Sequence, residues 1–231
     1  MRKLICNIIA GSMLVSAFQA VPSAAKSTPK LSTEQVFLEK GDTKKITMRG
    51  LSKKQTVKWT TGNSKIFSVS KKGKIRAKKA GEAKLTAKVG KKKYRCKVVV
   101  SPKIKMTFNN DVFTEERFET LKKIELGGYY KVQDPVLLKM VYSKYASISL
   151  RFRTEEEMNF DEKDKRIGMS SGPKFYFGKK PNLLSVTFLT RNRVIIGDEV
   201  YVIYEGDEKC REANELIRKY GIIIPLEGRY E

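Results

Sequence analysis

The chain has 231 residues with 48 Lys and Arg against 25 Asp and Glu, a formal net charge of +23, and it contains no histidine. The lack of histidine excludes sites that use this residue as a general base near neutral pH or as a metal ligand. Most of the excess charge falls in residues 26–100, with 23 basic against 4 acidic residues, whereas residues 101–231 are nearly balanced, which predicts two units with different surfaces.

The N-terminus has the features of a secretory signal peptide. Arg2 and Lys3 precede a mostly apolar stretch over residues 4–21, and small residues follow up to Ala25. This pattern predicts a signal peptide over residues 1–25, cleaved after Ala25, and a linker over residues 26–30. No later stretch approaches the length of a membrane helix, so we expect no membrane span in the mature chain. The mature protein is expected to be secreted or non-covalently associated with the cell wall.

Residues 31–101 consist of short segments that alternate apolar and polar residues, separated by Gly, Asn and Lys turns. A period of two with turns at this spacing is typical of a β-sandwich. The sole tryptophan lies on the buried phase of its segment and is predicted to anchor the core, and Gly73 and Gly81 are predicted in turns. The side chains predicted to fill the core are Val57, Trp59, Val69, Ile75, Leu85, Tyr94, Cys96 and Val98.

Several motifs in this region follow one another in a specific order. Trp59 is followed by Thr-Thr and a short apolar strand, then by the turn Lys72-Gly73-Lys74-Ile75 and the strand Ala80 to Ala87. Over about residues 31–100 the chain resembles the bacterial immunoglobulin-like domain of group 2, although Phe67 and Ser68 stand where that family usually has small residues. The resemblance implies an immunoglobulin-like sandwich and an exported, non-enzymatic module of the invasin and intimin type, often a spacer or an adhesive unit.

Basic side chains occupy the predicted outward positions of the strands of this sandwich, and residues 71–72 and 91–93 add further lysines in predicted turns. Such a surface attracts polyanions without a shaped pocket, and anionic cell-wall polymers or another surface or host macromolecule are the expected partners. The same lysines are equally consistent with solubility and with protection of strand edges. Nucleic acid is not expected, because the lysines are not interleaved with exposed aromatic residues. The predicted polyanion-binding residues are Lys71, Lys72, Lys74, Arg76, Lys78, Lys84, Lys88, Lys91, Lys92, Lys93, Arg95 and Lys97.

Residues 102–231 are predicted to form a small α+β domain with a mainly antiparallel sheet. Helices are predicted from Thr114 to the Gly127-Gly128 pair, from Asp134-Pro135 onward, and from Asp207 to Gly221. No family is recognised in this part. Strands are predicted at 148–152, 175–177, 184–190, 194–204 with a turn at Gly197-Asp198, and 222–224.

No residue of the sequence is assigned to catalysis, a cofactor or a metal. The acidic stretch that contains Glu155, Glu156, Glu157, Asp161, Glu162 and Asp164 lacks the pattern of a calcium loop and is predicted to be solvated. Cys6 falls in the predicted signal peptide. Cys96 and Cys210 could form a disulfide, but we favour the interpretation that both are buried free thiols.

The sequence thus favours a monomeric binding or structural protein of the cell envelope, without enzymatic activity. In this hypothesis the cationic sandwich gives spacing and retention, and the C-terminal domain makes the specific contact. One alternative is an extracellular hydrolase of wall or host glycans with a pair of carboxylates in residues 101–231. Another is an assembly or inhibitory protein that binds a second exported protein.

Overall fold

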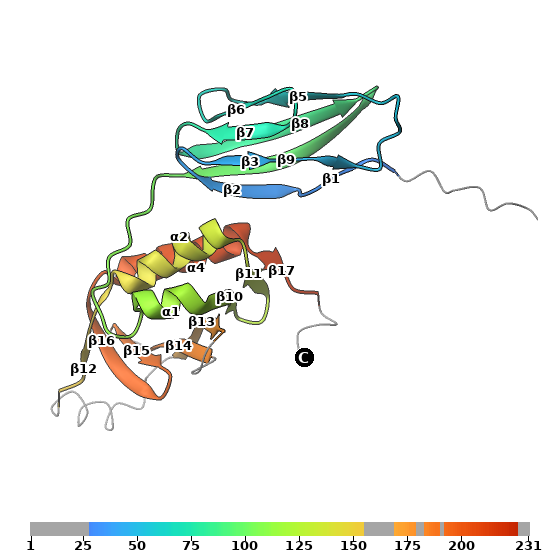
Figure 1. Ribbon diagram of the computed structural model, residues 1–231. Helices are drawn as coiled ribbons and strands as arrows, with labels where there is room; N and C mark the ends of the chain where they lie inside the picture. Colours follow the sequence, from blue (N-terminus) through green and yellow to red (C-terminus); the bar gives the residue numbers. More distant parts are fainter. Residues whose placement is uncertain (1–27, 155–168, 179–182, 190–191, 226–231) are drawn as a thin grey trace, which may run out of the picture.

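The computed structural model describes residues 28–154, 169–178, 183–189 and 192–225. The predicted signal peptide and the acidic stretch over residues 155–164 lie outside these residues. Figure 1 shows a β-sandwich followed by an α+β unit, and the predicted fold class is confirmed.

The sandwich consists of two main sheets. One has the strand order β2-β9-β8-β5 and the other has the order β3-β7-β6, while β1 and β4 pair separately. Strands β2 and β9 are parallel, and the other pairs are antiparallel. The strands are β1 (Lys30–Leu31), β2 (Gln35–Glu39), β3 (Thr43–Lys45), β4 (Met48–Arg49), β5 (Val57–Thr61), β6 (Phe67–Val69), β7 (Lys74–Ala77), β8 (Gly81–Val89) and β9 (Lys92–Ser101).

Alternation along the strands places the core between the two sheets. In β7, for example, Ile75 and Ala77 are buried whereas Lys74 and Arg76 are exposed. Of the predicted core residues, Ile75, Leu85, Cys96 and Val98 are fully buried, and Trp59 and Val69 are partly buried and pack against them. Val57 and Tyr94 are on the core-facing side of their strands, but both remain partly exposed near the β8–β9 turn.

The α+β unit is built on an eight-stranded antiparallel sheet with the order β12-β16-β15-β14-β13-β10-β11-β17. Helices α2 and α4 pack against each other and against β10, and Figure 1 shows them between this sheet and the sandwich. Its elements are α1 (Glu115–Thr120), β10 (Leu121–Leu126), β11 (Tyr130–Val132), α2 (Pro135–Ala146), β12 (Ser149–Phe152), β13 (Met169–Phe177), β14 (Leu183–Leu189), β15 (Arg193–Ile196), β16 (Glu199–Glu205), α4 (Asp207–Tyr220) and β17 (Ile222–Ile223).

The prediction of one helix from Thr114 to Gly127 was wrong in its second half. Helix α1 ends at Thr120, and Leu121–Leu126 is the strand β10. Ile124 and Leu126 are buried two residues apart, because β10 pairs with β11 on one side and β13 on the other. The predicted cap at Asp207 is also corrected, since Gly206 occupies the N-cap position in a left-handed conformation.

Cys96 and Cys210 are free, and each is buried in the core of a different unit. The disulfide alternative is therefore not adopted. Burial raises the pKa of Cys96 to about 11 and that of Cys210 to about 12. Thiols with such pKa values are poor nucleophiles near neutral pH. No helix in the described part of the chain is long and apolar enough to cross a membrane.

The outer face of the four-stranded sheet is partly covered by the helices of the α+β unit. Phe37 on β2 and Val99 on β9 point away from the sandwich core and join the hydrophobic core of the α+β unit. The ring of Phe37 meets that of Tyr220 edge to face, with 5.5 Å between the ring centroids. Apolar burial of this kind is what joins the two units.

Candidate functional site

The predicted polyanion-binding residues are divided between the two outer faces of the sandwich and its turns. Lys74 and Arg76 lie on β7 of the three-stranded sheet. Lys71 and Lys72 lie in the β6–β7 turn, Lys78 follows β7, and Lys91 lies in the β8–β9 turn. The four-stranded sheet carries Lys84 and Lys88 on β8 and Lys92, Lys93, Arg95 and Lys97 on β9. All of these side chains are exposed except that of Lys97, which is half-buried.

Strand pairing brings three lysines into one line on the outer face of the four-stranded sheet. Lys58 on β5 is opposite Lys88 on β8, and Lys88 is opposite Lys93 on β9. We call these three residues the lysine row. Side chains directly opposite each other have Cβ atoms roughly 4.5–5.5 Å apart, and like charges in such positions are destabilising. The next outward row along the sheet is formed by Thr60, Thr86 and Arg95.

Lys97 belongs to the interface between the units rather than to the open cationic surface. Its Nζ lies 3.1 Å from Oε2 of Glu82 and 4.7 Å from the ring centre of Tyr220. Glu82 also accepts hydrogen bonds from Lys219 Nζ, at 2.6 Å, and from the Tyr220 hydroxyl. The bonds from Lys219 and Tyr220 are the main cause that lowers the pKa of Glu82 to about 2.

A Glu82→Gln variant is expected to be less stable than the wild type near neutral pH and to lose this difference in acid. The pKa of Glu82 is lowered from 4.5 to about 2 by folding, so its contribution is complete above pH 4.5 and is lost as the pH falls toward 2. Because the carboxylate is about one third exposed, we expect the substitution to lower the free energy of unfolding by about 1 kcal/mol at neutral pH. Urea unfolding at several pH values checks this, with Glu34→Gln as the control, and equal pH profiles for both variants would contradict it.

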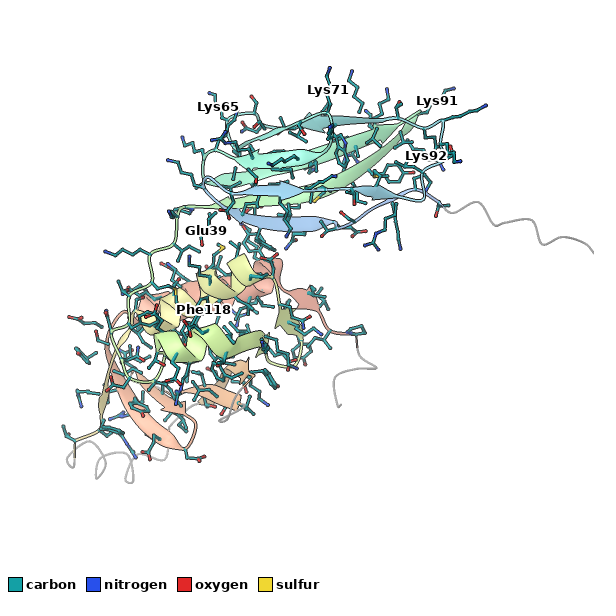
Figure 2. All side chains as sticks on the ribbon, in the orientation of Figure 1. Glu39, Lys65, Lys71, Lys91, Lys92 and Phe118 are labelled. Carbon is teal, nitrogen blue, oxygen red and sulfur yellow. The ribbon has the colours of Figure 1, made fainter. Side chains whose placement is uncertain are left out.

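Three of the four acidic residues of the sandwich, Glu34, Glu39 and Glu82, lie on the side that the α+β unit covers. Glu34 directly precedes β2, Glu39 ends β2, and Asp42 lies in the following turn. Glu39 accepts hydrogen bonds from Lys139 Nζ at 2.7 Å and from the Ile104 amide at 3.2 Å. Figure 2 shows Glu39 facing the helices, and Lys65, Lys71 and Lys91 on the opposite margin of the sandwich. The side of the sandwich that faces away from the α+β unit therefore carries cationic side chains.

A second candidate site is a cleft in the α+β unit, which the sequence did not predict. It has a volume of about 690 Å³ and lies between the segment around α1 and the strands β12, β15 and β16. Leu184 and Ile196 contribute its apolar floor. Its other lining side chains are Phe108, Asn109, Asn110, Asp111, Val112, Arg117, Leu150, Arg151, Phe152, Glu199 and Tyr201.

One asparagine holds the wall of this cleft in place. The Asn110 Oδ1 atom accepts hydrogen bonds from the amides of Val112, at 3.1 Å, and Phe113, at 2.8 Å. Its Nδ2 atom lies 3.0–3.3 Å from three carbonyl oxygens at and after the C-terminal end of α2, those of Tyr145, Ala146 and Ile148. A single side chain thus satisfies backbone groups of two segments and fixes the position of the segment that precedes α1.

Opposite charges meet around the Tyr201 hydroxyl in the cleft. Burial and the charge of Glu199 raise the pKa of Tyr201, and Asp111 acts in the same direction, whereas Arg117 lowers it. Arg117 also donates from Nη1 to the Val112 carbonyl at 2.6 Å. Two carboxylates therefore line one concave site, and the hydrolase alternative further requires that their carboxyl groups face each other roughly 5–9 Å apart. Within the described residues, no group of three or more Cys, Asp and Glu side chains is arranged to hold a metal ion.

Comparison with known proteins gives low similarities to solved structures and one family match. No curated protein matches the chain. Domains 4 and 5 of the S-layer protein SbsC are 22% identical, with a TM-score of 0.28 over 32% of this chain and 51% of that chain, so the present chain spans about half of that structure. The protein SGBP-B of the Bacteroides ovatus mixed-linkage glucan utilization locus, in complex with a mixed-linkage heptasaccharide, is 13% identical, with a TM-score of 0.25 over 66% of this chain and 44% of that chain. Residues 28–98 match the family model of the bacterial Ig-like domain (group 2), which confirms the resemblance based on Trp59, Gly73 and the strand that follows Gly81.

Proposed function

We propose that this chain is an exported binding protein of the cell surface. In this proposal the sandwich retains the protein on anionic surface polymers, and the α+β unit makes the specific contact. The observation that carries the proposal is the lysine row, which remains exposed on the outer face of the four-stranded sheet beside the part that the helices cover. The signal peptide predicted over residues 1–25 and the match to a bacterial Ig-like family support the location outside the cytoplasm.

Protection of strand edges does not account for this row. In the order β2-β9-β8-β5, the strands β8 and β9 are interior, so Lys88 and Lys93 guard no edge, and only Lys58 lies on an edge strand. Three ammonium groups in line repel one another at close range. A bound polyanion relieves this repulsion, because each phosphate or carboxylate group can sit between two lysines. The arrangement therefore favours a binding role over a purely solubilising one.

Replacing the lysine row by glutamine, in the variant Lys58→Gln, Lys88→Gln and Lys93→Gln, is expected to weaken binding to purified anionic wall polymer. Each lost phosphate contact should reduce the slope of log K against log salt by roughly 0.7–0.9, a total of about 2 to 3. Pull-down or calorimetric titration over a range of salt concentrations measures the slope.

A control variant with the same change in net charge separates position from charge. Lys103, Lys105 and Lys122 are exposed lysines outside the sandwich strands, and their replacement by Gln should change the slope much less. Equal slopes for the two triple variants would mean that net charge alone attracts the polymer. Wild-type binding that does not respond to ionic strength would refute the electrostatic mechanism itself.

A glycan hydrolase is the second candidate function, and one observation favours it. Asp111 and Glu199 line the same cleft, and paired carboxylates are the usual machinery of glycoside hydrolysis. Release of reducing ends from purified wall glycan tests this candidate directly. Activity that is abolished by both Asp111→Asn and Glu199→Gln would support the hydrolase over the binding protein, and no release by the wild type would exclude it for that substrate.

A further inference from the structure

The cleft of the α+β unit carries an exposed aromatic surface at its mouth. Phe152 at the end of β12 is 63% exposed, and its ring stacks on that of Tyr201 with a centroid distance of 4.9 Å and an angle of 29° between the planes. Tyr201 thus supports the Phe152 ring, most of which is open to solvent. Phe108, which is 36% exposed, lines the same cleft. Several aromatic side chains that are exposed together in one cleft, rather than singly on the surface, are typical of a ligand-binding groove.

The polar groups around these rings both donate and accept hydrogen bonds. The carboxylates of Asp111 and Glu199 accept, the guanidinium of Arg117 donates, and the Tyr201 hydroxyl does both. The lining contains two arginines and two carboxylates, so its formal charges cancel. Unlike the lysine row, this cleft therefore does not select for a charged ligand.

We propose that this cleft binds a neutral oligosaccharide, with one pyranose ring stacked on Phe152. The face of an aromatic ring carries partial negative charge and attracts the polarised C–H groups on the apolar face of a sugar. The hydroxyl groups on the rim of a sugar donate and accept, as the surrounding side chains do. This inference deepens the proposed function, because it identifies the contact made by the α+β unit and the class of its ligand.

The size and support of the cleft are suited to this ligand. A volume of about 690 Å³ falls within the range of 300–1,000 Å³ that is usual for small-molecule sites. The five backbone contacts of Asn110 hold one wall, and the stacked pair on β12 and β16 forms the other. A wall that is fixed before binding avoids the entropy cost of ordering it on binding.

Binding of the full chain to an array of neutral hexasaccharides of glucose, N-acetylglucosamine, mannose and galactose tests the proposal, followed by calorimetry on each sugar that binds. Phe152→Ala is expected to weaken binding at least about tenfold. Tyr204→Ala is the matched control, because Tyr204 is 59% exposed on β16 but does not line the cleft. Phe152 is mostly exposed, so its replacement should leave the fold intact, which far-UV circular dichroism checks.

The failure of this inference can be separated from the failure of the proposed function. Binding of the neutral sugar should change less than about twofold between low and high salt and should survive replacement of the lysine row. Conversely, Phe152→Ala should leave the salt-sensitive binding of anionic polymer unchanged. Failure of all four sugars to bind, or equal effects of Phe152→Ala and Tyr204→Ala, would overturn the assignment of the cleft without affecting the role of the lysine row.

Discussion

Replacement of Gly73 by Ala is expected to lower the free energy of unfolding of the sandwich by about 3 kcal/mol. Gly73 has a φ of +78°, a conformation that residues with a Cβ rarely adopt. A Cβ at this position would lie 2.4 Å from the Ile46 carbonyl oxygen and 2.9 Å from the ring of Trp59. The Ile46 amide donates to the Gly73 carbonyl at 2.9 Å, so the backbone cannot retreat without breaking this bond.

The effect can be measured through the fluorescence of Trp59, the only tryptophan of the chain, during urea unfolding. Gly90→Ala is the control, because Gly90 has a φ of +57° and a Cβ added there would meet nothing within 4 Å. Gly90→Ala introduces the same backbone strain without the steric overlap, so it should lower the free energy of unfolding by only about 1 kcal/mol. Similar losses in the two variants would show that the contact between Gly73 and Trp59 contributes little.

The sandwich could be predicted because its strands and turns are determined by residues that are neighbours in the sequence. Alternation such as Lys74-Ile75-Arg76-Ala77 determines which side chains face the core, and glycines such as Gly73 mark the turns. In the α+β unit the same reasoning failed at Leu121–Leu126. Phe118, Leu121 and Ile124 are spaced as in a helix, and only pairing with β11 and β13, which lie on both sides of this segment, makes it a strand.

The candidate sites were predictable to different degrees for the same reason. Alternation identified Lys88 as outward-facing, whereas Lys93 was predicted in a turn and lies on β9. Only the pairing register shows that these two lysines are opposite each other and that Lys58 completes the row. The cleft depends on Phe108, Phe152 and Tyr201, which come from three segments far apart in the chain. No local pattern connects these residues, since the pairing of β12 with β16 brings Phe152 and Tyr201 together and the hydrogen bonds of Asn110 hold the segment that contains Phe108.

The docking of the two units links the two proposed sites. The α+β unit covers the outer face of the four-stranded sheet around Glu82 and Val99, whereas the lysine row on the same face remains exposed. Phe37 and Val99 of the sandwich belong to the hydrophobic core of the α+β unit. Loss of stability in one unit should therefore be transmitted to the other.

Phe113→Ala tests this coupling and is expected to destabilise the α+β unit by about 3–5 kcal/mol. Phe113 is fully buried, and its ring centroid lies 5.2–5.6 Å from those of Tyr142, Tyr145 and Phe175. Far-UV circular dichroism reports this unit, because the helices of the described residues all lie in it, whereas Trp59 fluorescence reports the sandwich. Phe113→Leu, which leaves a smaller cavity, should cost about 1 kcal/mol.

If the interface couples the units, Phe113→Ala should shift the fluorescence transition to lower urea along with the dichroism transition. The same test can be repeated in a Glu82→Gln background, because Glu82 connects the sandwich to Lys219 and Tyr220 of α4. In that background, Phe113→Ala should shift the fluorescence transition less than it does in the wild-type background. A dichroism transition that moves while the fluorescence transition stays in place would mean that the contacts of Phe37 and Glu82 are too weak to join the two units. In that case the lysine row and the cleft would act as separate sites on a chain with two independently folding parts.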